Sequence, residues 1–266
     1  MKRLFIAIAA TAMTAIADAQ VMRQNFMDGV KPGDTLEKHV YTEARASQVF
    51  EGTWNGAFSK KENNMPSPKA AEGLSYPGYK ESGASIAFGY EAGVKGTRAS
   101  TYTLTQNGKG VGGKGTMYVS CLVRINGKIG VKSPKQIINL ATYPTGAGAR
   151  AGISITRSAT EQGKINIGCD LQKVRVLSSK GINMKETNLI VLKLDYNKGE
   201  VSLFINPDTK GAEPAADCVA KAGDDPEGKS SLKGAIKALS IINSNSFSNI
   251  LIGNFRISAD WTSICN

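Results

Sequence analysis

Apolar and polar residues alternate along two adjoining stretches, residues 190–196 and 201–206. Side chains two positions apart lie on the same face of a β-strand, so each stretch predicts a strand with one apolar face. The link Asn197-Lys198-Gly199 fits a short hairpin loop, because glycine readily adopts the positive φ that such loops require. An apolar hairpin of this kind needs a second layer to cover it. The residues expected to face inward are Ile190, Leu192, Leu194, Tyr196, Val201, Leu203 and Ile205.

Most of the remaining chain has the same character. Short segments rich in β-branched and aromatic residues follow one another, separated by glycine, proline and asparagine. The best helical pattern covers residues 35–49, and the polar residues 208–231, which contain two prolines, predict a long surface loop. Trp261 follows the last expected strand and is expected to cover the open end of the core. The pattern therefore predicts an all-β protein, an antiparallel two-sheet sandwich with little helix.

The first 19 residues differ from the rest. Lys2 and Arg3 precede an apolar run, and Ala17-Asp18-Ala19 supplies small residues where a signal peptidase cleaves. We expect residues 1–19 to be a signal peptide and residues 20–266 to be one domain. No comparable apolar run follows, so the sequence predicts an exported protein with no transmembrane anchor, in the periplasm, at the cell surface or outside the cell.

The chain is basic, with 33 Lys and Arg against 22 Asp and Glu and a net charge of +11. A positive surface attracts acidic partners such as anionic polysaccharides, nucleic acids or lipid headgroups. The lysines are scattered, without a run of four basic residues. This distribution favours an ordinary soluble surface over a specific nucleic-acid site.

Four cysteines in an exported chain allow disulfide bonds. Alternation places Cys121 and Cys169 on the apolar faces of their strands. Cys218 lies in the polar loop, and Cys265 is next to last in the chain. If disulfide bonds form, we therefore expect Cys218–Cys265 to tie down the C-terminus, with Cys121 and Cys169 either paired or buried as free thiols.

Several motifs occur in a familiar order. They are Gly52-Thr53-Trp54, Gly73-Leu74-Ser75-Tyr76-Pro77-Gly78-Tyr79, Gly115-Thr116-Met117-Tyr118-Val119-Ser120, Val201-Ser202-Leu203-Phe204-Ile205-Asn206-Pro207 and Ile252-Gly253-Asn254-Phe255-Arg256-Ile257. This set resembles bacterial secreted proteins with a concanavalin A-like or laminin G-like jelly-roll domain, over residues 26–261. The resemblance implies two curved antiparallel sheets. It also implies a function among proteins that bind or cleave carbohydrate or serve in adhesion.

The known catalytic patterns of such folds are missing. Laminarinase-type hydrolases carry Glu-x-Asp-x-x-Glu on one strand, and no Glu-x-Asp occurs in this chain. Alginate-lyase-type proteins have a histidine two residues after a strand glutamine, but Gln136 is followed by Ile137 and Ile138. The single histidine, His39, lies far away, and no Gly-x-Ser-x-Gly is present. The sequence therefore gives no motif for a laminarinase-type hydrolase, an alginate-lyase-type enzyme or a serine hydrolase.

Two weaker groups of residues are candidates for ligand binding. Sugar binding needs an exposed aromatic ring beside hydrogen-bonding groups. Trp54, Tyr79, Tyr143 and Arg150 lie in or near glycine-rich loops and are the candidate ligand-binding residues. Calcium is a weaker candidate. Its possible oxygen ligands are Asp217, Asp224, Asp225 and Glu227, whose spacing matches no calcium loop.

Together these observations favour a noncatalytic carbohydrate-binding module with a glycan or polysaccharide partner. Two alternatives stay open: a polysaccharide lyase or glycoside hydrolase with an unrecognised site, and a structural or adhesion module that uses its basic surface.

Overall fold

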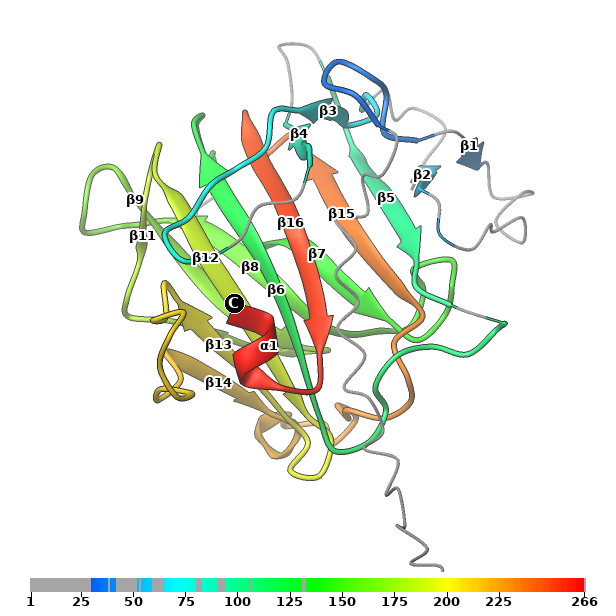
Figure 1. Ribbon diagram of the computed structural model, residues 1–266, viewed down its shortest axis with the longest axis vertical. Coiled ribbons are helices and arrows are strands. Elements are labelled where there is room, and N and C mark those ends of the chain that lie inside the picture. Colours follow the sequence, from blue (N-terminus) through cyan, green and yellow to red (C-terminus); the bar gives the residue numbers. More distant parts are fainter. Residues whose placement is uncertain are drawn as a thin grey trace, which may run out of the picture.

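The computed structural model describes residues 30–37, 39–41, 52, 54–58, 65–79, 83–89, 94–105, 107–130 and 133–265. Within these residues, two sheets pack face to face as a sandwich (Figure 1). The predicted all-β, two-sheet class is confirmed. The expected signal peptide, residues 1–19, lies outside the described residues. Among the described residues, no helix has the length and apolar character needed to cross a bilayer.

One sheet has nine strands, and its strands pair antiparallel except for the first two, which pair parallel. Its order is β1-β2-β5-β15-β7-β8-β9-β10, and β11 also pairs with β9. The strands are β1 (His39–Tyr41), β2 (Trp54–Phe58), β5 (Thr97–Thr103), β15 (Ala238–Ser244), β7 (Lys135–Ala141), β8 (Ala149–Arg157), β9 (Lys164–Leu171), β10 (Val174–Leu177) and β11 (Ile182–Asn183).

The other sheet has seven strands in the order β14-β13-β12-β6-β16-β4-β3. A short 3-10 helix, η2 (Ala222–Asp224), follows β14, and helix α1 (Trp261–Cys265) follows the last strand. The strands are β14 (Cys218–Lys221), β13 (Glu200–Ile205), β12 (Thr187–Asp195), β6 (Thr116–Ile125), β16 (Ile250–Ser258), β4 (Ser85–Phe88) and β3 (Lys69–Ala71).

The predicted hairpin is the pair β12 and β13. In this sheet β13 lies next to the edge strand β14, and β12 lies between β13 and β6. Leu194 is paired with Val201 and Leu192 with Leu203, and all four side chains are fully buried. They belong to the main hydrophobic core, between the two sheets. Gly199 closes the turn at a φ of 65°. The period-two pattern therefore specified both the register and the buried face of the hairpin.

Replacing Gly199 by alanine is expected to lower the free energy of unfolding by about 1–2 kcal/mol, because the left-handed region is costly for a residue with a Cβ atom. An added Cβ would lie 3.6 Å from the nearest heavy atom, in Ala222, so the cost is conformational and not steric. Gly223→Ala is the control, since its φ is not positive and its Cβ would meet nothing within 4 Å. Urea denaturation of both variants measures the difference, and equal losses would contradict this account.

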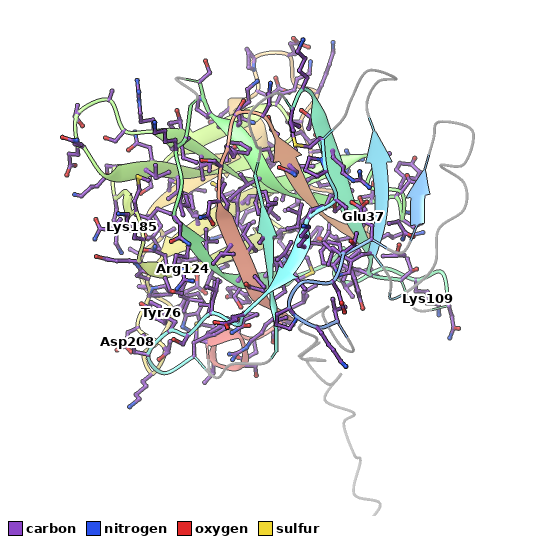
Figure 2. The ribbon with its side chains drawn as sticks, turned by 90° about the horizontal axis from the view of Figure 1, so that it is seen from above. Glu37, Tyr76, Lys109, Arg124, Lys185 and Asp208 are labelled. Carbon is purple, nitrogen blue, oxygen red and sulfur yellow. The ribbon has the colours of Figure 1, made fainter. Side chains whose placement is uncertain are left out.

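The seven-stranded sheet buries its outer face as well, beneath α1 and residues 72–79 (Figures 1 and 2). Leu122, Val191 and Phe204 point to this side and form a second apolar cluster with Leu74 and Trp261. The ring of Trp261 meets that of Phe204 edge-on at 4.9 Å between centroids. The expectation that Trp261 covers the open end of the main core was wrong. It covers the outer face of a sheet, because α1 folds back across β6 and β16, and the Trp261 ring reaches Phe204 on β13.

Residues 72–79, which cover this face, are packed near their C-terminal end against residues 208 and 209. Asp208 lies near Tyr76 (Figure 2), and burial, followed by the charge of Asp208, raises the pKa of the Tyr76 phenol. An added Cβ at Gly78 would lie 2.2 Å from Oγ1 of Thr209, so the two segments pack in close contact. The outer face of the seven-stranded sheet is therefore closed by packed side chains.

Two other expectations need correction. Residues 35–49 do not form the expected helix where the structure describes them: Thr35 bridges to Lys69, and residues 39–41 form strand β1. The rest of that segment lies outside the described residues. The expected loop 208–231 contains an edge strand, β14, which pairs with β13. In both places backbone pairing with a neighbouring strand, which local sequence does not encode, determines the conformation.

Candidate functional site

The outer face of the nine-stranded sheet is polar, in contrast to that of the other sheet. Side chains that precede or follow the core residues on each strand must point outward, because strand residues alternate between faces. Strand pairing aligns six outward positions in one row across the sheet. This polar row consists of Thr101, Ser240, Asn139, Gly152, Asp170 and Arg175.

Asp170 is the centre of the hydrogen bonds in the polar row. Its carboxylate is 1% exposed although it points away from the main core. Oδ2 accepts bonds from Ser154 Oγ at 2.6 Å, Gln136 Nε2 at 3.0 Å and Arg175 Nη2 at 3.2 Å. Oδ1 accepts from Arg175 Nε at 2.5 Å. Four donors from three strands therefore satisfy this buried carboxylate and compensate its desolvation.

Gly152 makes this arrangement sterically possible. It lies between β7 and β9 in the sheet, opposite Asn139 and Asp170. A Cβ atom at this position would lie 2.2 Å from Gln136 Nε2 and 2.5 Å from the carbonyl oxygen of Ile138. The amide of Gln136 crosses β8 over this glycine to reach Asp170, and any larger residue would block the crossing.

Arg175 is held in place and is partly open to solvent. Its Nε and Nη2 donate side-on to Asp170, its Nη1 donates to the Pro134 carbonyl at 3.0 Å, and its side chain is 37% exposed. A guanidinium has five N–H groups in a fixed plane. The contacts with described residues use three, which leaves one on Nη1 and one on Nη2. Those two N–H groups suit a planar anion such as a carboxylate.

The other half of the polar row lies under the loop between β7 and β8, residues 142–148. Asn139 Nδ2 donates to the Gly146 carbonyl at 3.4 Å, and the Thr101 and Ser240 hydroxyls bond each other at 2.8 Å. Asn139 is 8% exposed, and its buried Oδ1 has no hydrogen-bond partner among the described residues. A buried acceptor of this kind requires a donor, which a buried water molecule would supply.

Two of the four predicted ligand-binding residues are buried, so that part of the prediction is wrong. Trp54 is 3% exposed and packs edge-on against Tyr102 with 5.4 Å between ring centroids. Tyr79 is 2% exposed, and its hydroxyl donates to the Asn254 carbonyl at 2.7 Å. Burial raises the pKa of the Tyr79 phenol, which keeps it a neutral donor. Neither ring has a free face for a sugar, because both complete hydrophobic clusters.

The other two predicted residues lie at the surface near the end of the β7–β8 hairpin. Tyr143, in the 142–148 loop, is 60% exposed and is the one exposed large apolar side chain among the described residues. Arg150, at the start of β8, is half-buried and donates from Nε to the Lys233 carbonyl at 3.2 Å. It is two residues from Gly152 and so shares the outward face with the polar row.

The acidic loop uses its oxygens within the protein. Asp225 accepts backbone N–H bonds from Glu227 at 3.0 Å, Lys229 at 3.0 Å and Ser230 at 2.7 Å, and these bonds lower the pKa of its carboxyl. Asp217 accepts the Ile205 N–H at 2.6 Å. Over the described part of the chain, no three His, Cys, Asp or Glu side chains are grouped to hold a metal ion. Binding of calcium by Asp217, Asp224, Asp225 and Glu227 stays a prediction.

The expected pairing of Cys218 with Cys265 was wrong. Cys218 lies in the main core with its Sγ 3.7 Å from that of Cys169, whereas Cys265 belongs to the cluster under α1. Cys121 and Cys169 point into the main core, as alternation predicted. The error arose because residues 218–221 were assigned to a loop, and the strand they form turns Cys218 inward.

A hollow of about 440 Å³ lies elsewhere, between residues 66–69, β4 and β15. Its most prominent polar lining residue, Asn243, is already paired: Oδ1 accepts the Gly89 N–H at 3.1 Å, and Nδ2 donates to the Pro66 carbonyl at 3.3 Å. Arg175, at one end of the polar row, keeps two N–H groups without a partner among the described residues, and the polar row is therefore the stronger candidate.

Sequence reasoning identified Gln136 as a strand residue but missed Asp170 and Arg175. Asp170 is an acidic residue next to the inward-facing Cys169, a signal that alternation makes visible. Its partners could not be predicted, because Gln136 and Ser154 reach it through strand pairing. The side chain of His39 lies outside the described residues.

Comparison with known proteins supports the fold. No family model matches the chain, and no curated protein matches it. The globular domain of T. cruzi calreticulin matches with a TM-score of 0.51 at 11% identity, covering 80% of this chain and 86% of that one. The cellulose induced protein Cip1 matches with a TM-score of 0.45 at 12% identity, covering 80% and 94%. An alginate lyase from Alteromonas matches with a TM-score of 0.39 at 8% identity, covering 68% and 90%.

At this level of identity, the calreticulin match shows a shared β-sandwich and leaves the activity open. The sandwich is the fold that the resemblance to jelly-roll domains implies. Secretion and a laminin G-like relationship stay predictions.

Proposed function

We propose that this chain is a noncatalytic binding module for acidic polysaccharide and that the ligand binds at Arg175, the solvent-exposed end of the polar row. The observation that carries the proposal is the Arg175 guanidinium, which Asp170 and Pro134 hold in place with two N–H groups left for a ligand. A fixed guanidinium loses little side-chain entropy on binding, so its bonds to a carboxylate contribute more to affinity.

Three features of the chain support this ligand class. The net charge of +11 attracts polyanions over distances near the Debye length. The exposed ring of Tyr143 offers an apolar surface to a sugar. Export, which the N-terminal sequence predicts, would bring the protein into contact with such polysaccharides.

Binding without catalysis agrees with the role of Asp170. Both its oxygens accept hydrogen bonds and its carboxylate is 1% exposed, so it positions Arg175 and does not face a substrate. A lyase or hydrolase needs a titratable group within hydrogen-bond reach of the substrate. The structural or adhesion alternative uses the same basic surface without requiring a sugar.

Arg175→Gln is expected to weaken binding of polygalacturonate or alginate by about 10–100-fold, the loss of a charged hydrogen-bond pair. Isothermal titration calorimetry with the mature protein measures the change. Arg157→Gln is the matched control, because it removes the same charge from the exposed end of β8, outside the polar row. We expect the control to bind within about twofold of the unchanged protein, as a distant charge contributes little.

Three outcomes would overturn the proposal. The first is equal loss in the two variants, which would indicate a diffuse charge effect. The second is binding to neutral glucans only. The third is release of unsaturated or reducing sugars during the titration, which would favour the lyase or hydrolase alternative.

A further inference from the structure

Two cysteines meet across the interior of the sandwich. Cys169 lies on β9 of the nine-stranded sheet and Cys218 on β14 of the seven-stranded sheet, with 3.7 Å between their Sγ atoms. Both are buried, at 0% and 8% exposure. A disulfide bond has an S–S distance of about 2.05 Å, so the two sulfur atoms are close to bonding distance and must move toward each other to form the bond.

We propose that Cys169 and Cys218 form a disulfide bond that ties the two sheets together. The surroundings favour this pair over the other two cysteines. Cys121 lies on β6, in the middle of its sheet, and Cys265 is the last residue of α1, on the far side of that sheet. The other contacts of the pair are with backbone: Cys169 Sγ is 3.2 Å from the Val201 carbonyl, and Cys218 Sγ is 3.4 Å from that of Val176.

The chemistry is thiol–disulfide exchange with a disulfide-containing oxidant, such as oxidised glutathione or an oxidoreductase. The Cys218 thiolate attacks the oxidant, forms a mixed disulfide and releases one thiolate, which takes up a proton. The Cys169 thiolate then attacks Cys218 Sγ and releases the second thiol. The two protein thiols are oxidised, and the oxidant's disulfide is reduced to two thiols. Cys218 lies on an edge strand and is the more exposed of the two, at 8% against 0%, which suits it to be the first nucleophile.

Because both sulfurs are buried, the stage at which the disulfide can form is restricted. An oxidant cannot reach Cys169 at 0% exposure in the closed sandwich. β14 is a four-residue edge strand, and such a strand separates from its sheet at lower cost than a central one. Exchange therefore takes place during folding or when β14 opens.

The bond would lie directly behind the polar row. Cys169 precedes Asp170 on β9, and Val176, whose carbonyl meets Cys218, follows Arg175 on β10. β10 is itself an edge strand, so Arg175 depends on its few neighbours for its position. The disulfide braces β9 and β10 against β14. Its effect on ligand binding rests on the proposed function, whereas its formation does not.

Peptide mapping tests the bond itself. The mature protein is refolded with oxidised and reduced glutathione, alkylated after unfolding without reductant, digested and analysed by mass spectrometry. We expect one linked peptide pair containing Cys169 and Cys218, with Cys121 and Cys265 alkylated. Four alkylated cysteines, or a link through Cys265, would overturn the proposal.

Thermal unfolding and binding test its consequence. Reductant is expected to lower the unfolding temperature on the order of 10 °C and to leave a Cys169→Ala/Cys218→Ala variant unchanged. Cys121→Ala is the control, which should keep the full response to reductant. Weaker binding of polygalacturonate after reduction supports the proposed effect of the disulfide on the binding site. Unchanged binding overturns that effect but leaves the disulfide itself in place. If the oxidised protein binds no acidic polysaccharide, the proposed function fails while the mapped bond stands.

Discussion

Replacing Arg98 by methionine is expected to lower the free energy of unfolding by about 3–5 kcal/mol, because it leaves a buried carboxylate without its cation. Arg98 Nε donates to both Glu37 oxygens, at 2.9 and 2.8 Å, and its Nη2 makes a further bond to Glu37. Ser100 also donates to Glu37, and Arg98 Nη1 donates to the Met65 carbonyl at 3.2 Å. The ion pair connects residue 37, which precedes β1, to β5, the third strand from that edge of the nine-stranded sheet.

The control for this prediction is Lys164→Met. Lys164 pairs with Glu161 at the surface, where ion pairs contribute less than about 1 kcal/mol. Denaturant titration of both variants gives the two free energies. Adding Glu37→Gln to Arg98→Met is expected to recover part of the loss, since the uncompensated charge is removed. A loss below about 1 kcal/mol for Arg98→Met would show that Glu37 reaches water in the native state.

Trp261→Ala is expected to cost a similar amount, about 3–5 kcal/mol, as large aromatic truncations in packed clusters do. Trp261 is 6% exposed and meets the rings of Phe204 and Tyr118 at centroid distances of 4.9 and 5.7 Å. Without it, α1 loses its largest contact with the outer face of the seven-stranded sheet. The apolar cluster beneath would then be open to water.

Tyr143→Ala is the matched aromatic control for Trp261→Ala. Tyr143 is 60% exposed, so its loss should change stability by less than about 0.5 kcal/mol. Thermal denaturation measures stability, and binding of a hydrophobic dye at room temperature reports exposure of the cluster. Equal stability losses in the two variants, or no added dye binding with Trp261→Ala, would contradict the covering role of α1.

Alternation predicted the central hairpin correctly, because a strand with one buried face must repeat its apolar residues every second position. The same rule placed Leu192, Val201, Cys121 and Cys169 in the core, where the structure has them. Alternation gave less information about the strand faces that point away from the main core. Val191 was predicted to face away from the core, and it is buried all the same, under the layer that α1 completes.

The candidate site was predicted less well. Trp54 and Tyr79 were chosen because aromatic residues near glycines suit sugar binding, and both proved to be buried. Glycine-rich sequence indicates a tight turn but does not say whether the neighbouring ring packs inward or outward. Tyr143 alone among the chosen aromatics is exposed.

The sequence by itself determined most of the strand segments and which of their faces is apolar, since both follow from the local period of the side chains. The strands β1 and β14 are exceptions, because pairing with a neighbouring strand decided them. The tertiary structure decided which strands are neighbours. That choice brought Asp170 to Arg175, Gln136 and Ser154, and placed Cys218 beside Cys169. The most distant of these contacts, Cys169 with Cys218, joins residues 49 positions apart. All of them depend on the order and register of the strands, which no single segment specifies.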